Sequence, residues 1–241
     1  MRSASIQIFA VLMAAAALPA IGQDDEAAAL NARGERQLEQ FVTEVRSLTG
    51  RFVQTVFDAE GAVEDEYSGT LDIDRPGRFR WVYEWPFEQR LIADGTNLWN
   101  YDVDLDQVSV TAQDEALGQS PAAVLSGTGE VLETLEIQGA FERDGVLWVQ
   151  MAVTEDSSDF SALRFGFDSE SGQIAGMQIT DTLGQLTVIR FDNVRTNVEM
   201  QESLFEFEPP EGIDVIGVPA GDDTSAGEVD LSDALPVAGF G

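Results

Sequence analysis

Hydrophobic and polar side chains alternate with a period of two residues along most of this chain beyond Arg51. Such alternation is typical of β-strands with one buried face, because successive side chains of a strand point to opposite sides of the sheet. The clearest instance is residues 78–85, in which charged side chains stand at Arg78, Arg80 and Glu84. The pattern predicts a strand whose other face is strongly aromatic, made of Phe79, Trp81, Tyr83 and Trp85.

The same alternation predicts further strands, separated by turn signals. Turns are indicated at Glu60-Gly61, Asp94-Gly95, Asp144-Gly145, Gly172 and Gly184. Within each strand, the apolar positions that share a face are Leu71 and Ile73; Trp99 and Tyr101; Leu147, Val149, Met151 and Val153; Leu163, Phe165 and Phe167; and Ala175, Met177 and Ile179. Strands that follow one another through short turns favour an antiparallel meander.

Two segments depart from the two-residue period. Between residues 27 and 49, apolar residues recur at spacings of three and four, which predicts a helix that stops at Gly50. Between Gln113 and Leu135 the alternation lapses. There, residues 121–125 predict a short helix, because proline is favoured at a first helical position.

A sheet with one apolar face needs a cover, and this sequence offers at most two or three short helices to provide it. The first interpretation is an ordinary packed core between sheet and helices. The second is a concave apolar site, because many bulky side chains share one face while few helical residues cover it. The pattern alone leaves both interpretations open.

The two ends of the chain differ from its middle. Residues 1–22 have the features of a secretory signal peptide, with Arg2 at the start, an apolar stretch, and small residues before Gln23. No later stretch approaches the roughly 20 apolar residues of a membrane helix, so we expect a soluble exported protein. Residues 23–216 form one predicted domain, and residues 217–241 are predicted to be a disordered acidic tail.

Composition narrows the chemistry. The net charge is −31 and every basic residue is arginine, so nucleic acid and anionic lipid headgroups are poor partners. The chain has no cysteine and no histidine, which excludes disulfides, lipid attachment to cysteine, thiol nucleophiles and imidazole chemistry. Asp102, Asp104 and Asp106 imitate a calcium loop, but Gln107 and Gln113 replace its glycine and glutamate. We therefore expect no metal and no cofactor.

Several sequence motifs follow one another in a distinctive order. Residues 49–54 contain a Phe-x-Gln segment, and residues 74–81 contain Arg-Pro-x-x-Phe-x-Trp. Residues 92–102 contain Asp-Gly-x-x-Leu-Trp-x-Tyr, Ser120-Pro121 precedes an apolar turn, and residues 205–212 read Phe-x-Phe-x-Pro-Pro-x-Gly. In this order the motifs resemble those of the LolA family of periplasmic lipoprotein carriers, in which they form the entry to the first strand, a strand segment, a hairpin, the start of a short covering helix and a closing signature. The order of these motifs, rather than any one of them, carries the resemblance.

The resemblance implies a mainly β fold with helices, an unclosed antiparallel β half-barrel under a helical lid. It implies a monomeric, non-enzymatic carrier in the periplasm that holds acyl chains and moves lipoproteins from the inner to the outer membrane. Its implied partners are acylated lipoproteins, an inner-membrane ABC transporter of the LolCDE type and an outer-membrane receptor of the LolB type.

The resemblance also assigns roles to residues of this chain. It implies that Arg75 closes the empty cavity and yields to ligand; alternation places Arg75 on the face of Leu71 and Ile73, where its donors can reach lid carbonyls. The candidate acyl-chain cavity comprises Phe52, Leu71, Ile73, Phe79, Trp81, Tyr83, Leu91, Trp99, Tyr101, Val124, Leu125, Leu147, Val149, Met151, Phe165, Met177 and Ile179.

Other functions stay open at this point. A carrier or sensor of the same architecture with a different lipid or glycolipid is the nearest alternative. An envelope hydrolase that works through paired carboxylates is a second, although with 44 acidic residues such pairs arise by chance. A structural envelope protein that binds no acyl chain is a third.

Overall fold

The computed structural model describes residues 23–113, 121–127, 135–153 and 160–220. Among these residues, the α-helices α1 (Gln23–Glu44) and α3 (Pro121–Ser126) and a 3₁₀ turn, η3 (Glu202–Leu204), accompany the strands. The strands are β1 (Ser47–Phe57), β2 (Val63–Asp74), β3 (Arg78–Trp85), β4 (Gln89–Ala93), β5 (Asn97–Asp102), β6 (Gln107–Ala112), β7 (Leu135–Arg143), β8 (Val146–Val153), β9 (Phe160–Asp168), β10 (Ile174–Asp181), β11 (Leu186–Thr196) and β12 (Asp214–Ile216). The predicted strand at residues 78–85 and the helix near Pro121 are confirmed.

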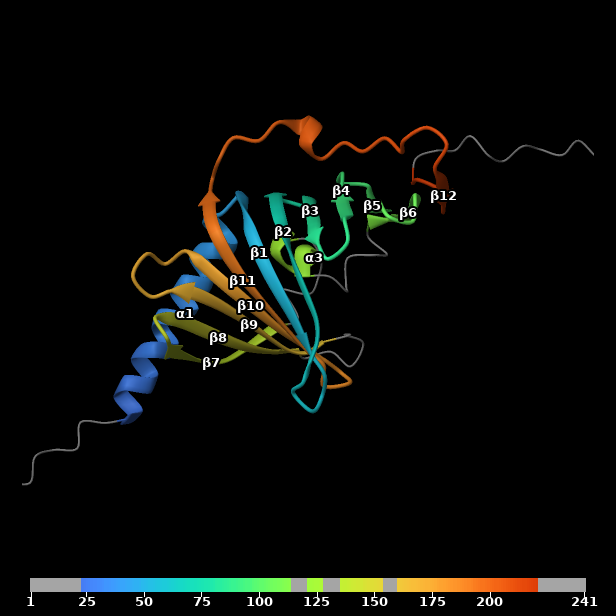
Figure 1. Ribbon diagram of the computed structural model, residues 1–241. Coiled ribbons are helices and arrows are strands. Elements are labelled where there is room, and N and C mark those ends of the chain that lie inside the picture. The colour runs from blue at the N-terminus through green and yellow to red at the C-terminus, as the bar shows by residue number, and fades with distance from the viewer. Residues whose placement is uncertain (1–22, 114–120, 128–134, 154–159, 221–241) are drawn as a thin grey trace, which may run out of the picture.

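One twelve-stranded sheet contains all these strands, in the order β12-β6-β5-β4-β3-β2-β1-β11-β10-β9-β8-β7. Two antiparallel meanders, β1–β6 and β7–β11, are joined where β1 pairs with β11. The last strand, β12, lies parallel to β6 at one edge. The two edge strands, β12 and β7, do not pair with each other, so the predicted unclosed sheet is confirmed (Figure 1).

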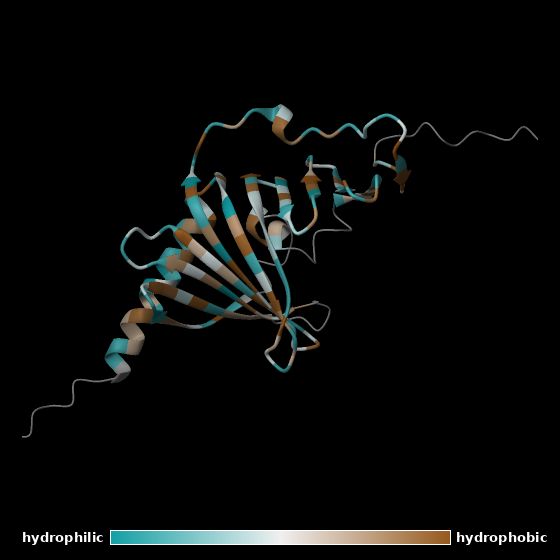
Figure 2. Ribbon diagram, in the orientation of Figure 1, coloured by the Kyte–Doolittle hydropathy of each residue, from teal (hydrophilic) through white to brown (hydrophobic). Residues whose placement is uncertain are grey.

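The sheet has an apolar face beneath the helices, which we call the inner face. Side chains on it form the main hydrophobic cluster together with Leu38 and Phe41 of α1 and Val124 and Leu125 of α3. Apolar and polar residues alternate along the strands, as the two-residue period predicts (Figure 2). α1 packs on β7 and β8, while α3 packs on β2 and β3. Each helix therefore covers a different part of the inner face.

The predicted end of the first helix is wrong. α1 ends at Glu44, and the chain enters β1 at Ser47, so Leu48 and Gly50 belong to a strand. The register of β1 against β11 shifts between Thr49 and Arg51, which makes Gly50 part of a β-bulge and not a helix stop. Val45 lies in the link between α1 and β1, and Leu48 is held in the strand by its pairing with Ile73 of β2 and Thr196 of β11.

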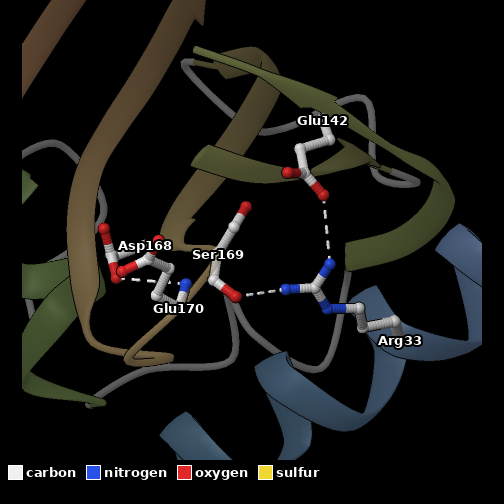
Figure 3. A network of polar contacts seen from close by, with 5 residues as sticks. All are labelled: Arg33, Glu142, Asp168, Ser169 and Glu170. Carbon is white, nitrogen blue, oxygen red and sulfur yellow. Dashed lines mark hydrogen bonds and ion pairs between the residues drawn. The ribbon is translucent and has the colours of Figure 1, made fainter. Parts of the chain in front are cut away.

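Polar contacts tie the first half of α1 to the sheet. Arg33 donates hydrogen bonds to the carboxylate of Glu142 in β7 over 3.0 Å and to the backbone carbonyl of Ser169 over 2.5 Å (Figure 3). Gln37 donates to the carbonyl of Gly172 in the same β9–β10 turn. Both contacts reach elements more than 100 residues away in the chain, so they hold α1 against β7 and the β9–β10 turn.

In the part of the chain that the structure describes, no helix is long and apolar enough to cross a membrane. The predicted signal peptide at residues 1–22 lies outside the described residues, as does most of the predicted tail, residues 221–241. Ala220 is the last described residue of the C-terminal segment. Its backbone N–H donates a hydrogen bond to the side-chain oxygen of the buried Asn97.

Candidate functional site: the inner face beneath the two helices

The main hydrophobic cluster gathers most of the predicted cavity residues on the inner face. Tyr83 and Leu91 are partly buried and pack against this cluster, while Leu147 is buried on the same face of β8 as Val149. The predicted residues within the cluster are Phe52, Leu71, Ile73, Phe79, Trp81, Val124, Leu125, Val149, Met151, Phe165, Met177 and Ile179. The sequence therefore identified a set of side chains that the fold does bring together.

Aromatic rings form the centre of this cluster between β1 and β3. The rings of Phe52 and Trp81 lie 4.4 Å apart between centroids, and Tyr83 meets Phe52 edge to face at 5.4 Å. Phe191 of β11 stands 6.5 Å from Trp81 on the other side. These separations are those of directly packed aromatic pairs. A second aromatic group lies under α1, where Phe165 and Phe167 of β9 each stand 5.7 Å from the ring of Phe41.

Arg75 lies in the turn between β2 and β3 and contacts both helices. Its Nε donates a hydrogen bond of 2.8 Å to the carbonyl of Leu125 in α3. Its Nη1 donates to the carbonyl of Phe41, at 2.8 Å, and to that of Val45, at 3.1 Å, at the end of α1. The guanidinium also lies 4.5 Å from the centre of the Phe41 ring, a cation–π distance. One side chain therefore joins the two covering helices.

The positive charge of Arg75 is stabilised by the dipoles of backbone carbonyl groups. None of the ion pairs among the described residues involves it, and its hydrogen-bond partners are carbonyls. Burial lowers the pKa of Arg75 from 12.5 to about 10, so the side chain stays protonated at neutral pH. A cation without a carboxylate partner is costly to keep half-buried, which makes this contact easier to give up than an ion pair.

The contact of Arg75 with α1 was missed by sequence reasoning, which expected lid carbonyls alone. The last four carbonyls of a helix lack partners within it, and a basic residue in the last turn commonly supplies one. The last turn of α1 has no basic residue. The absence of a basic residue in this turn was the sequence signal that a cation from another part of the chain binds the helix end.

Gln113 holds the turn that carries Arg75. Its side-chain nitrogen donates to the carbonyl of Gly77 over 2.7 Å, and its side-chain oxygen accepts the N–H of Gly95 over 3.0 Å. The N–H of Gly77 in turn donates to the carbonyl of Ser126 at the end of α3. The buried amide of Gln113 is therefore two hydrogen bonds away from the covering helix.

The placement of Trp99 and Tyr101 in the cavity was wrong. Directly opposed residues of antiparallel strands share a face, and Trp99 pairs with Ile92, which pairs with Arg80. Trp99 therefore lies on the face opposite Trp81, which we call the outer face. There, Trp99 and Tyr101 form a second cluster with Ile92, Val108 and Val110, covered by Phe207 and Ile213 of the C-terminal segment.

A pocket of about 370 Å³ opens beside the start of α3. It reaches Ile179, a predicted cavity residue, and Leu183 at its rim, whose side chain is 85% exposed. The lining residues are Pro121, Phe160, Ile179, Asp181, Thr182, Leu183, Gln185 and Thr187. It gives the β9–β11 end of the inner face an opening to solvent.

Comparison with known proteins agrees with this geometry. A family model for the outer membrane lipoprotein carrier protein LolA matches residues 43–208. An outer-membrane lipoprotein carrier protein of Nitrosospira multiformis is 37% identical, over 77% of this chain and 89% of the relative. One from Chromobacterium violaceum is also 37% identical, over 87% of this chain and 97% of the relative. This chain belongs to the LolA family.

Among solved structures, a LolA superfamily protein from Nitrosomonas europaea is similar, with a TM-score of 0.43 and 9% identity over 75% of this chain and 97% of that one. The family model over residues 43–208 confirms the resemblance seen in the ordered motifs. One motif residue, Asp94, has a clear structural role. The carboxylate of Asp94 accepts the N–H groups of Thr96 and Asn97 and the indole N–H of Trp99, which fixes the hairpin.

Proposed function

We propose that this protein is a periplasmic carrier that binds lipoprotein acyl chains on its inner face and transfers lipoproteins from the inner to the outer membrane. The observation that carries the proposal is the contact of Arg75 with the carbonyls of Leu125, Phe41 and Val45 above a large apolar cluster. A carrier needs an apolar site that closes when empty, and one side chain that joins both covers supplies a means of closing it. The names of its relatives as lipoprotein carriers support the cargo class.

In the proposed cycle, acyl chains enter between the inner face and α3 and displace Arg75 from its carbonyl partners. Burial of about ten methylenes contributes roughly 8 kcal/mol, at about 0.8 kcal/mol for each. Part of this free energy offsets the opening of the closed state, so the apparent affinity is lower than the intrinsic one. Cargo is then released to an acceptor that needs no such opening. No bond of the cargo is broken, and the family is one of carriers and not of enzymes.

The unequal size of the two covers supports α3 as the part that moves. α1 has 22 residues and is held by Arg33 and Gln37 as well as by Arg75. α3 has six residues, and the hydrogen bonds that its carbonyls accept include those from Arg75 and Gly77. When the Arg75 contact is lost, α1 keeps the hydrogen bonds of Arg33 and Gln37.

The proposed partners follow from family membership. Cargo is an acylated lipoprotein, loaded by an inner-membrane ABC transporter of the LolCDE type and delivered to an outer-membrane receptor of the LolB type. Export to the periplasm is assigned to residues 1–22, with their apolar stretch and small-residue end.

A release assay tests this function. The mature protein is incubated with spheroplasts that contain the cognate transporter, and the soluble fraction is examined for a triacylated lipoprotein. We expect a soluble one-to-one complex, and no release of a matched cargo whose acylated cysteine is replaced by serine. Equal release of both cargos, or release of neither, would reject acyl-chain carriage of lipoproteins.

A further inference from the structure

Trp81 carries an unpaired hydrogen-bond donor in the middle of the inner face. Its side chain is 1% exposed, and its Nε1 is one of the buried polar side-chain atoms in the described residues without a hydrogen-bond partner. Buried donors in native proteins are nearly always paired, because an unpaired one loses its bond to water without replacement. A phenylalanine would fill an apolar position of this kind without that cost, so the indole N–H calls for an explanation.

Two more polar groups lie beside this donor. The hydroxyl of Tyr83 donates a long hydrogen bond of 3.4 Å to the side-chain oxygen of Gln54, which is itself buried. Tyr83 also interacts with the Trp81 N–H, an interaction that lowers the pKa of Tyr83, but the two do not adopt hydrogen-bond geometry. Burial outweighs this effect and raises the pKa of Tyr83 to about 12. The hydroxyl therefore keeps its proton at neutral pH and remains a donor.

We propose that the indole N–H of Trp81, with the Tyr83 hydroxyl beside it, forms a recognition site for an acyl ester carbonyl of the cargo. This inference rests on the proposed function, since it concerns how the same inner face binds an acyl chain. A hydrocarbon tail cannot satisfy an N–H donor, whereas the carbonyl at the head of each acyl chain is an acceptor of matching type.

The surroundings favour a neutral carbonyl over a charged group. The packing and pairing neighbours of Trp81 include Phe52, Leu71 and Leu91, and none of these three offsets a negative charge. Transfer of an unpaired carboxylate or phosphate into such a place is far more costly than transfer of an ester. Leu71 pairs with Trp81 across the two strands, and Arg75 follows Leu71 by four residues. At about 3.3 Å per residue, the backbone of Arg75 is roughly 13 Å from that of Leu71. Trp81 and Arg75 thus mark separate parts of the inner face.

A pair of lipid probes tests the inference. The mature full-length protein is titrated with a tripalmitoylated cysteinyl peptide that has ester-linked glycerol chains, and with an analogue whose two glycerol chains are ether-linked. The tails are the same length, so the two probes differ in the ester carbonyls. We expect the wild-type protein to bind the ester probe about twofold to tenfold more tightly, the equivalent of one net hydrogen bond.

Substitution of Trp81 by phenylalanine should remove this preference. Trp81→Phe keeps an apolar ring but has no N–H, so the two probes should bind with equal affinity while the ether probe binds nearly as before. Trp85→Phe is the matched control, because Trp85 lies in the same strand with a side chain that is 55% exposed. Its preference for the ester probe should stay intact. Tyr83→Phe should reduce the preference in part.

A spectroscopic measurement covers the case in which Trp81→Phe folds poorly. In ¹⁵N-labelled wild-type protein, the indole N–H resonance of Trp81 should move downfield with the ester probe and less with the ether probe. Equal movement with both probes, or no ester preference in the wild-type protein, would overturn the carbonyl site and leave acyl carriage standing. Failure of both probes to bind would count against the proposed function and the carbonyl site together.

Discussion

The Nε of Arg75 and the carbonyl oxygen of Leu125 lie 2.8 Å apart, although 50 residues separate them in the chain. This bond joins the turn after β2 to α3, and the same guanidinium reaches the end of α1. A single substitution therefore removes the hydrogen bonds that join this turn to both helices.

Arg75→Leu should slow the release of cargo. The closed, empty state loses hydrogen bonds from a charged donor, worth about 1.5–3 kcal/mol, while the loaded state loses little. The apparent affinity should rise by roughly 10- to 100-fold, and transfer to the acceptor should slow accordingly. Stopped-flow transfer of a fluorescent acyl probe measures the rate. Arg51→Leu is the control, because it removes an exposed ion pair with Glu84; an unchanged transfer rate in Arg75→Leu would show that the arginine is no switch.

Gln113→Leu should destabilise the fold. Its amide bonds the carbonyl of Gly77 and the N–H of Gly95, and leucine leaves both groups unpaired. We expect the free energy of unfolding to fall by about 1–3 kcal/mol in urea titrations. The exposed Gln173 gives the control variant Gln173→Leu, which should stay within about 0.5 kcal/mol of wild type. Equal stability of both variants would rule out this role for the Gln113 amide.

Trp99→Leu should lower stability without weakening acyl binding. Trp99 packs with Phe207 on the outer face and donates to Asp94, so its loss should cost about 2–4 kcal/mol. Leu71→Ala, on the inner face, should lower both stability and affinity. Affinity for the ester probe and urea unfolding are measured on the same samples. If Trp99→Leu lost as much affinity as Leu71→Ala, the assignment of Trp99 to the outer face would be wrong.

Acid should loosen the β9–β10 turn. Hydrogen bonds from the backbone and side chain of Ser171 hold the pKa of Asp168 below its ordinary value of 3.8. Because the folded-state pKa is the lower one, this carboxylate contributes stability that is fully present above pH 3.8 and is lost as the pH falls through the folded pKa.

Asp168→Asn should abolish that part of the pH dependence and reduce the protection of α1 from hydrogen exchange at neutral pH. The turn supplies the Ser169 and Gly172 carbonyls to α1. Asp181→Asn is the matched control, since Asp181 accepts similar turn hydrogen bonds from Leu183 and Gln185 at the β10–β11 turn. Equal exchange of α1 in the two variants would disprove the coupling.

Alternation within a strand was enough to predict the shared face of Phe79, Trp81 and Tyr83 in β3, because that pattern depends on local geometry alone. It did not show that Trp85, beyond a register shift against β2, is 55% exposed. It was not enough for Trp99, whose face relative to Trp81 is set by the register of β3, β4 and β5. A shift of one residue in any of these pairings reverses the assignment. The sequence therefore indicated which side chains of one strand share a face. It did not indicate which faces of different strands lie on the same side of the sheet.

The contacts of Arg75 illustrate the same limit. Its position before a proline and its alternation with Leu71 and Ile73 were visible in the sequence. Its bond to Phe41 depends on where α1 ends, and the predicted end was five residues too late, at 49 rather than 44. An error of that size moves the helix carbonyls by more than one turn of about 3.6 residues.

The unclosed sheet leaves two edge strands whose backbone groups are potential templates for another chain. At one edge, β12 pairs with β6 over Asp214–Ile216. At the other, Asn31 of α1 accepts the N–H of Ala140 in β7 over 2.7 Å, next to a register shift at Gly139. One edge is thus a strand of only three residues, and the other has an N–H group bonded by a helix and a bulge beside it. Short or interrupted edges of this kind disfavour edge-to-edge pairing with a second copy of the chain.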